Sequence, residues 1–322
     1  MGMYVRFCDP LIQIHTPAKL NLFLEVLGRR KDGFHEIETL MTPISMFDTL
    51  DLSSNSDGDI RLTCRWATGV AAQMAASSSG QGSPWDALPA ASDNLVVRAL
   101  NRLRQRAGVE AGACVRLVKR IPAAAGLGGA SSDAAAALVG GNRLWRLGWS
   151  RARLAEVAAE VGSDVPFFLQ AGAAICRGRG ERIERLGRLE PLQVVVVRPP
   201  AGLSTAEVYR HCQPAETPCR VEGIMEAARR GCPVLVGRRL FNRLQAAAEQ
   251  LSPWVARLHA AFDHLDCGGH QMSGSGTTYF GVCRHARHAR HVAGQLRSAG
   301  WGAVFQVTTL SVAARQDEGE PH

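Results

Sequence analysis

An alternation of apolar and polar residues, typical of β-strands, marks the first ordered segment of the chain. Between positions 20 and 27, leucine or valine alternates with residues that include Asn21 and Glu25. Apolar runs predict three further strands, at 11–15, 45–52 and 113–119.

A long helix is predicted from Gly129 to Trp145, with four alanines at 134–137. Gly140 and Gly141 lie inside it, and each costs about 1 kcal/mol relative to alanine in a helix interior. We therefore expect a kink or close packing at these two glycines.

The second half of the chain mixes strands and helices. Predicted strands lie at 173–176, at 193–198 and on both sides of 272–278, and predicted helices lie near 204–211, 221–230, 239–250, 254–261 and 285–298. Such a mixture is typical of a second α/β domain. The predicted fold class is α/β (α+β) with two domains.

Residues 53–93 are rich in Ser, Gly and Ala, above all at 75–84. This composition is too polar and too flexible for a core element. We expect a long surface insertion between two β segments, and we favour a disordered excursion without function over a functional loop.

Length and composition limit the class of protein. A chain of 322 residues with 46% hydrophobic residues suits two domains of ordinary size. No apolar run approaches the eighteen or so residues of a membrane helix, and the first ten residues lack the apolar core of a signal peptide. We expect a cytoplasmic protein with no membrane partner. The nine cysteines include no C-x-x-C pair, which argues against a disulfide framework or a thiolate zinc site.

The formal net charge of +8 suits nucleic acid, a membrane surface or a polyanionic small molecule, and does not choose among them. Lysine occurs only at positions 19, 31 and 119. Lys19 is either kept because a compact ammonium is required, or is an ordinary surface cation at a strand end. The histidine and arginine repeat at 284–291 indicates a solvated helix face, because neighbouring cations repel a divalent metal.

The segment Pro122–Asp133 carries the strongest chemical signal, because it joins a predicted strand, a glycine-rich turn and a helix start. Gly126, Gly128 and Gly129 let an anion approach main-chain N–H groups, and a helix start favours negative charge. Neither the Walker pattern nor G-x-G-x-x-G fits. Taken alone, the segment is either a cradle for a nucleotide phosphate or a plain turn before a packed helix.

Three further motifs accompany this loop. Pro17–Glu36 opens with P-A-K-L-N-L-F-L and contains D-G-F-H, Gly162–Phe168 is G-S-D-V-P-F-F, and Met272–Thr278 is M-S-G-S-G-T-T. Together the four motifs resemble the GHMP superfamily of small-molecule kinases, which includes galactokinase, homoserine kinase and mevalonate kinase. The D-G-F-H element is similar to that of the kinases acting on 4-diphosphocytidyl-2-C-methyl-D-erythritol, a cytidine diphosphate-linked sugar alcohol of the non-mevalonate isoprenoid route.

The resemblance implies a two-domain fold with the active site in the cleft between the domains. An N-terminal domain over 1–168 holds most of the ATP, and a C-terminal domain covers 169–322. Asp164 is implied as the base that takes the proton of the substrate 2-hydroxyl, with Lys19 as its cationic partner. Magnesium enters with ATP, and we name no protein ligand to a metal.

The binding residues carry over from the same motifs. The residues expected to contact ATP are Asn94, Pro122, Ala123, Ala124, Ala125, Gly126, Leu127, Gly128, Gly129, Ala130, Ser131 and Ser132. Those expected to contact the cytidine substrate are Asn21, Phe34, His35, Tyr209, Ser273, Gly274, Ser275 and Gly276. Cytosine would lie between two aromatic rings, each stacking contact contributing about 1 to 3 kcal/mol.

Several of these residues also have ordinary structural interpretations. Asp164 suits a helix N-cap, Asn94 suits a turn, and Phe34 or Tyr209 taken singly suits core packing. The chain also departs from the family pattern, with alanine where glycine is frequent in the loop and with Thr277 for a frequent alanine. We expect the affinity for the nucleotide to differ from that of other family members, and we expect the family's phosphoryl-transfer reaction to be unchanged.

Two rival functions stay open. One is another GHMP kinase, of the homoserine or mevalonate type, and Phe34, His35 and Tyr209 argue against it. The other is a basic RNA-binding α/β protein, and the lack of a clustered basic and aromatic face argues against nucleic acid as a partner. The sequence leaves the oligomeric state open.

Overall fold

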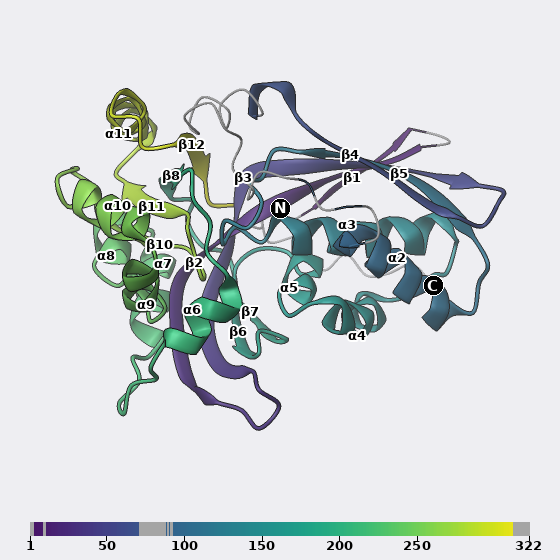
Figure 1. Cartoon of the computed structure of the whole chain (residues 1–322), viewed down its shortest axis with the longest axis horizontal. Coiled ribbons are helices and arrows are strands. Elements are labelled where there is room, and N and C mark those ends of the chain that lie inside the picture. The colour runs from purple at the N-terminus through teal and green to yellow at the C-terminus, as the bar shows by residue number, and fades with distance from the viewer. Residues whose placement is uncertain (1–2, 9–10, 71–87, 89, 91–92, 312–322) are drawn as a thin grey trace.

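The structure, a computed structural model, describes residues 3–8, 11–70, 88, 90 and 93–311. It contains two β-sheets with helices packed against both (Figure 1). The parts of the predicted insertion at 71–87, 89 and 91–92 lie outside the described residues. Within the described part, no helix is both long enough and apolar enough to cross a membrane.

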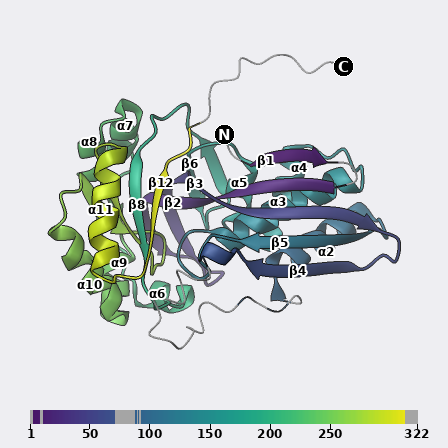
Figure 2. The same ribbon diagram turned by 90° about the horizontal axis from the view of Figure 1, so that it is seen from above.

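The first sheet is built on one long antiparallel pair of strands, β2 (Leu11–Arg29) and β3 (His35–Asn55). Beside one half of this pair lie β1 (Tyr4–Cys8), β5 (Gly112–Lys119) and β4 (Ile60–Trp66). Their order is β1-β2-β3-β5-β4, which Figure 2 shows from above. Only the β4 and β5 neighbours in this row are parallel.

The other half of the long pair carries three short strands. β6 (Ala174–Gly178) pairs with β3, β7 (Arg182–Arg185) pairs with β6, and β9 (Phe241–Asn242) runs parallel to β2. The strand predicted at 173–176 is thus confirmed, but it joins the first sheet although it follows residue 168. The domain boundary at that residue remains a prediction.

Four helices cover one side of the first sheet: α2 (Leu95–Ala107), α3 (Gly129–Leu144), α4 (Arg151–Val161) and α5 (Val165–Leu169) (Figure 1). α2 and α3 contact its strands, and α4 and α5 pack against other helices of this group. The helix predicted from Gly129 is confirmed. A Cβ added to Gly140 would come within 2.8 Å of the Leu52 side chain, and one added to Gly141 within 2.8 Å of Leu100. Close packing therefore explains both glycines.

The second sheet is antiparallel, in the order β10-β11-β8-β12. Its strands are β10 (Gly269–Met272), β11 (Tyr279–Cys283), β8 (Gln193–Arg198) and β12 (Ala303–Thr308). The valine run of β8 is buried on both faces: Val194 and Val196 pack in the core shared with β2 and β3, and Val195 and Val197 in the core shared with α10 and α11. Burial on both sides accounts for the unbroken apolar pattern.

Six helices accompany this sheet: α6 (Thr205–His211), α7 (Glu222–Arg230), α8 (Pro233–Gly237), α9 (Gln245–Leu251), α10 (Pro253–Asp263) and α11 (Ala286–Ser298). The single helix predicted at 239–250 is wrong, because β9 takes part of the segment and α9 begins only at Gln245. The reason is tertiary: the Asn242 amide donates to the Met272 and Gly274 carbonyl oxygens, both at 2.8 Å.

Three expectations for the first half are also corrected. The segments 11–15 and 20–27 form one strand, and β3 starts ten residues before the predicted 45–52. The predicted insertion at 53–93 contains an ordered strand, β4, whose residues alternate between half-buried and exposed. Its parallel hydrogen bonds to β5 stabilise a segment that composition alone assigned to a loop.

The predicted solvated face at 284–291 is only partly correct. His288 is buried, and its Nδ1 accepts a hydrogen bond from the Arg284 N–H at 3.2 Å. His285 caps α11 by accepting from the His288 N–H. Two of the three histidines in the repeat are therefore used by local structure.

A buried ion pair ties β2 to the segment after β9. Glu25 is fully buried, and its two carboxylate oxygens accept from Arg243 Nε at 2.7 Å and Nη2 at 2.9 Å. The Cys219 N–H donates to the same carboxylate at 2.8 Å. Bidentate geometry and a third donor fix this junction between distant parts of the chain.

Candidate active site

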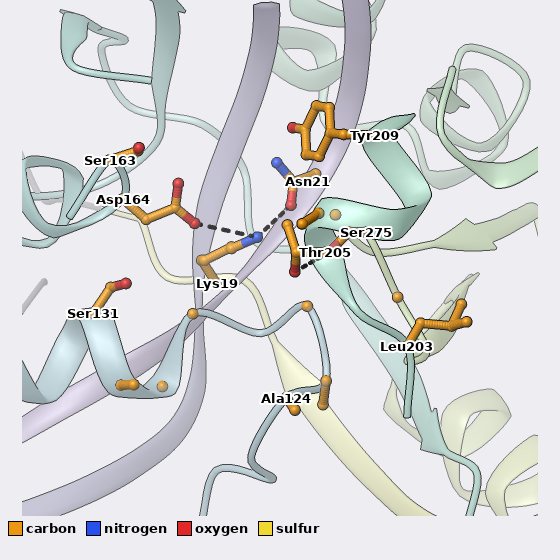
Figure 3. A pocket seen from close by; sticks show the side chains of 18 of the residues that line it. Lys19, Asn21, Ala124, Ser131, Ser163, Asp164, Leu203, Thr205, Tyr209 and Ser275 are labelled. Carbon is orange, nitrogen blue, oxygen red and sulfur yellow. Dashed lines mark hydrogen bonds and ion pairs between the residues drawn. The ribbon is translucent and has the colours of Figure 1, made fainter. Parts of the chain in front are cut away.

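A cavity of about 1300 Å³ is lined by residues from both halves of the chain. Its walls come from β2, the glycine loop at 122–131, the residues before α5, helix α6 and the loop at 274–276. Figure 3 shows these elements converging on Lys19, Asn21 and Asp164. The sequence motifs, which lie far apart along the chain, thus meet in one place.

Lys19 lies within β2 and is 3% exposed, so it is not a surface cation at a strand end. Its backbone N–H donates to the Leu127 carbonyl at 2.9 Å, which holds the glycine loop beside the strand. Its ammonium donates to Asn21 Oδ1 at 2.5 Å and lies 3.8 Å from Asp164 Oδ2 (Figure 3). Burial lowers the pKa of Lys19, and the Asp164 carboxylate offsets only part of this effect.

Asp164 occupies the N-cap position of α5, but its side chain makes no capping hydrogen bond. The side chain is 34% exposed and points toward Lys19 from across the cavity (Figure 3). All five residues of α5 are buried, which anchors the carboxylate at the cavity wall. The geometry leaves the carboxylate available to a ligand, unlike the helix cap that the sequence also allowed.

The glycine loop has the backbone that its sequence predicted. Gly126 and Gly128 adopt φ values of 73° and 69°, and α3 begins at Gly129. A Cβ added to Gly126 would lie 2.1 Å from the Ser273 carbonyl oxygen. No side chain caps α3, so the N–H groups of its first turn are available to an anion.

Two predicted loop residues do not line the cavity. Leu127 is buried in the core beside β2. The Ser132 hydroxyl donates to the Pro17 carbonyl at 2.6 Å and shares a hydrogen bond with the Thr16 hydroxyl. The Ser132 hydroxyl is therefore not available for the ATP contact that was expected of this residue. The other loop residues do line the cavity: Pro122, Ala123, Ala124, Ala125, Gly126, Gly128, Gly129, Ala130 and Ser131.

Ser273 also lies behind the cavity wall. Its hydroxyl donates to the Gly126 carbonyl at 3.1 Å and accepts from the Asn21 N–H at 3.3 Å. This fully buried side chain joins the glycine loop to β2. Its position is that of a residue that holds the site together, not of one that meets the substrate.

The following residues, Gly274, Ser275 and Gly276, line the cavity as expected. A Cβ added to Gly274 would lie 3.2 Å from Lys19 Nζ, so the backbone here lies directly against the ammonium. The Ser275 hydroxyl shares a 2.8 Å hydrogen bond with the Thr205 hydroxyl of α6 (Figure 3). This bond ties the loop to α6, which also carries Tyr209.

The predicted aromatic residues lie at the same cavity. Phe34 is 48% exposed, which excludes core packing, and the Arg179 guanidinium lies 4.8 Å from its ring centre. The His35 and Tyr209 rings lie 5.1 Å apart and are inclined by 32°. Burial, and secondarily the charge of Arg29, lowers the pKa of His35, so the imidazole is neutral at neutral pH.

Asn94 combines both of its interpretations. Its side chain caps α2 by accepting from the Val96 N–H at 3.0 Å. The residue nevertheless lines the cavity beside Leu88 and Leu95. Its structural role is therefore observed, and contact with a ligand remains a prediction.

Sequence reasoning missed several cavity residues. Lys119 and Asp133 lie behind the glycine loop in a buried cluster with Asp48, where Lys119 Nζ is 2.6 Å from Asp133 Oδ2. Ser163 and Arg179 also line the cavity. The scarcity of lysine was a signal for Lys119 as much as for Lys19, whereas nothing in the local sequence pointed to Arg179.

Comparison with known proteins places the chain in a family. The protein-family model described as "GHMP kinases N terminal domain" matches residues 94–172. The family model described as "GHMP kinases C terminal" matches residues 224–301. A protein of Pelotomaculum thermopropionicum named 4-diphosphocytidyl-2-C-methyl-D-erythritol kinase is 42% identical over 282 residues, which cover 87% of this chain and 92% of the relative.

Solved structures agree with this placement. A crystal structure of 4-(cytidine 5'-diphospho)-2C-methyl-D-erythritol kinase matches with a TM-score of 0.75 and 34% identity, covering 92% of this chain and 98% of that one. Homoserine kinase from Cytophaga hutchinsonii matches with a TM-score of 0.69 at 17% identity over 96% and 97% of the two chains, which shows a common fold alone. The chain therefore belongs to the GHMP kinases and, within them, to the 4-diphosphocytidyl-2-C-methyl-D-erythritol kinase family.

Proposed function

We propose that this protein transfers the γ-phosphoryl group of ATP to the 2-hydroxyl of 4-diphosphocytidyl-2-C-methyl-D-erythritol, giving the 2-phosphate and ADP. The observation that carries the proposal is the pairing of Lys19 and Asp164 at 3.8 Å in one cavity. The glycine loop lies on one side of this pair, and the aromatic residues Phe34, His35 and Tyr209 lie on the other. A phosphate donor and a nucleotide-linked alcohol could therefore meet between them.

In the proposed reaction, the 2-hydroxyl oxygen of the substrate attacks the γ-phosphorus of ATP. The Asp164 carboxylate accepts the proton of this hydroxyl. The bond between that phosphorus and the bridging oxygen breaks, and ADP leaves. The Lys19 ammonium keeps Asp164 ionised and stabilises the negative charge at the reacting oxygens. Positioning and charge supply most of the catalysis that such a transfer needs.

The triphosphate is proposed to lie on the glycine loop and the first turn of α3. Main-chain N–H groups and the helix dipole favour its negative charge there. Magnesium bound to the phosphates would neutralise further charge. Ser131 and Asp133 offer oxygen atoms in the cavity wall, and Asp133 Oδ1 is buried with no hydrogen-bond partner among the described residues.

The cytosine is proposed to bind at the aromatic end of the cavity. Phe34 presents an exposed ring, Tyr209 presents a second ring from α6, and a neutral His35 can both donate and accept a hydrogen bond. An Arg179 guanidinium over Phe34 would add positive charge near the diphosphate.

The wider setting follows from the same proposal. We propose a cytoplasmic enzyme of the non-mevalonate isoprenoid route whose partners are its two small-molecule substrates. From the sequence, the boundary between an ATP-holding domain and a second domain is predicted after residue 168. The strands β6 and β7 argue for a position after residue 185, because they pair within the first sheet.

The test is ADP release by the purified protein with four compounds: the cytidine substrate, homoserine, mevalonate and an RNA oligonucleotide. We expect the cytidine substrate to give a kcat/KM about 10³-fold or more above the other alcohols, because buried polar groups reject ligands that leave them unpaired. RNA should change nothing. Comparable rates with homoserine or mevalonate would overturn the assignment of the substrate but not the assignment of kinase activity.

A further inference from the structure

A second group of chemically active side chains lies away from the cavity. His259 and Asp263 stand on α10 and His270 stands on β10, and one candidate ligand atom from each lies within 4.8 Å of the other two. In the described part of the chain they are the only such triplet of metal-binding side chains. Figure 1 shows α10 and β10 at the end of the molecule opposite α2 and α4.

The backbone brings these three residues together. His259 and Asp263 are four positions apart on one helix, so they project from the same face. His270 Nε2 lies 3.3 Å from Asp263 Oδ1. Ligand atoms bound tetrahedrally to zinc stand about 3.4 Å apart. Asp263 is exposed and His259 is half-exposed, so small side-chain rotations can close the remaining gap.

An outer layer of hydrogen bonds orients both imidazoles. His259 Nδ1 lies 2.7 Å from Glu249 Oε1, and His270 Nδ1 lies 3.1 Å from the Tyr279 hydroxyl. Each bond occupies Nδ1, so Nε2 is the nitrogen that would bind a metal, and His270 Nε2 already faces the Asp263 carboxylate. Such carboxylate–histidine and hydroxyl–histidine pairs are how proteins commonly fix the ligating nitrogen.

The charge of the group also suits a cation. Asp263 and Glu249 supply two carboxylates, each beside one of the two imidazoles. The arginine-rich repeat on α11 differs, because His285 and His288 are used in local hydrogen bonds there.

We propose that His259, Asp263 and His270 bind a divalent transition-metal ion, with Zn²⁺ as the best match to two imidazoles and one carboxylate. Glu249 and Tyr279 orient the two imidazoles. The ion joins α10 to β10 and takes no part in the phosphoryl transfer.

The site also has a structural connection to the loop at 273–276 beside the cavity. Gln245 donates to Glu249 Oε1 at 2.9 Å, and its Oε1 accepts from the Met272 N–H at 3.0 Å. Met272 ends β10, directly before the 273–276 loop. An ion at the site would therefore stiffen the strand that leads into this loop.

The test uses the full chain without an affinity tag, titrated with Co²⁺ as a spectroscopic probe and with Zn²⁺ in competition. We expect one equivalent of Co²⁺ with the visible absorption of a tetrahedral or five-coordinate ion and no thiolate charge-transfer band. Asp263→Asn should weaken binding at least about a hundredfold and Glu249→Gln about tenfold. Zn²⁺ should raise the melting temperature of the wild type and not of Asp263→Asn.

Matched controls are Asp266→Asn and His291→Gln, which change exposed residues of the same types outside the triplet. Both should bind Co²⁺ as the wild type does. Circular dichroism checks that each variant is folded, and Asp263 is exposed enough to be replaced without loss of the fold. Absence of stoichiometric binding, equal binding by Asp263→Asn and the wild type, or a thiolate band would each overturn the site.

Discussion

The two buried lysines, Lys19 and Lys119, flank the glycine loop and have opposite environments. Lys119 Nζ contacts two buried carboxylates, Asp48 and Asp133. Burial opposes its charge, but the two carboxylates outweigh this effect and hold the pKa of Lys119 above its ordinary value. Lys19 has a single carboxylate nearby, that of Asp164, at 3.8 Å, and the Asp164 side chain is about one-third exposed. Burial lowers the pKa of Lys19.

The difference separates a structural cation from one suited to catalysis. A lysine matched by two carboxylates has no attraction left for a ligand. A buried lysine whose positive charge is only partly balanced by a carboxylate attracts any further negative charge, such as that of a phosphoryl group during its transfer. A Cβ added to Gly128 would lie 3.0 Å from Lys19 Cγ, and one added to Gly129 would lie 3.3 Å from Lys119 Nζ. One loop thus touches both.

The largest expected effect is on turnover at the Lys19 side. Asp164→Asn should cut turnover by about 10² to 10⁴ and leave both substrates bound within a few-fold, because the amide cannot accept the proton. Lys19→Met should also cut turnover. The double variant should fall well short of the product of both defects, because the two groups act as one unit. Steady-state kinetics and substrate binding by calorimetry measure these effects. If Asp164→Asn kept its turnover and melted at lower temperature, the residue would be a helix cap.

The Lys119 side should respond in stability. Lys119→Met should lower the free energy of unfolding by about 3 to 5 kcal/mol, because Asp48 and Asp133 would stay buried without a cation. Lys31→Met, at an exposed position, is the control and should change it by about 0.5 kcal/mol or less. Urea unfolding followed by circular dichroism measures both variants. Equal losses in Lys19→Met and Lys119→Met would remove the distinction between the two lysines.

The pH dependence of the same comparison has a definite sign. Because the folded pKa of Lys119 lies above its unfolded value, its stabilisation is complete below that value, about 10.4. It should decline only as pH rises beyond it. The difference in stability between wild type and Lys119→Met should therefore not decline from pH 7 to about pH 9, and ionisation of Asp133, whose pKa is raised by burial, would widen it in the variant. A decline within that window would contradict the assignment.

The aromatic end should be independent of both lysines. Phe34→Ala or Tyr209→Ala should raise the KM for the cytidine substrate about tenfold and leave that for ATP nearly unchanged, because one stacking face is lost. Phe34→Tyr, which keeps a ring, should behave as the wild type. Equal weakening of both substrates would instead indicate damaged packing.

The smallest expected effect concerns His35. Since burial lowers its pKa, the neutral imidazole persists from pH 8 down to about 6.5, and the KM for the cytidine substrate should be flat over that range. At more acid pH the KM should rise a few-fold, and His35→Gln should abolish the rise. A rise that persists in His35→Gln would assign it to another group.

The sequence alone determined the features that depend on local backbone chemistry and on recognisable motifs. The valine run of β8, the glycine loop and the start of α3 follow from residues that are neighbours in the chain. The same holds for the exposed Phe34, which lies between the polar residues Asp32 and His35 in the sequence. Local propensity and pattern were sufficient there, because no distant partner was needed to decide them.

Only the tertiary structure decided which of these residues face the cavity. Ser132 and Ser273 carry the expected hydroxyls, but hydrogen bonds to Pro17 and Gly126 hold them behind its wall. Strand β4 exists because β5 lies beside it, and the helix expected at 239–250 is interrupted where the Asn242 amide donates to the Met272 and Gly274 carbonyl oxygens. Hydrogen bonds between residues far apart in sequence leave no periodic signal in the chain. The opposite environments of Lys19 and Lys119 likewise depend on where distant aspartates come to lie.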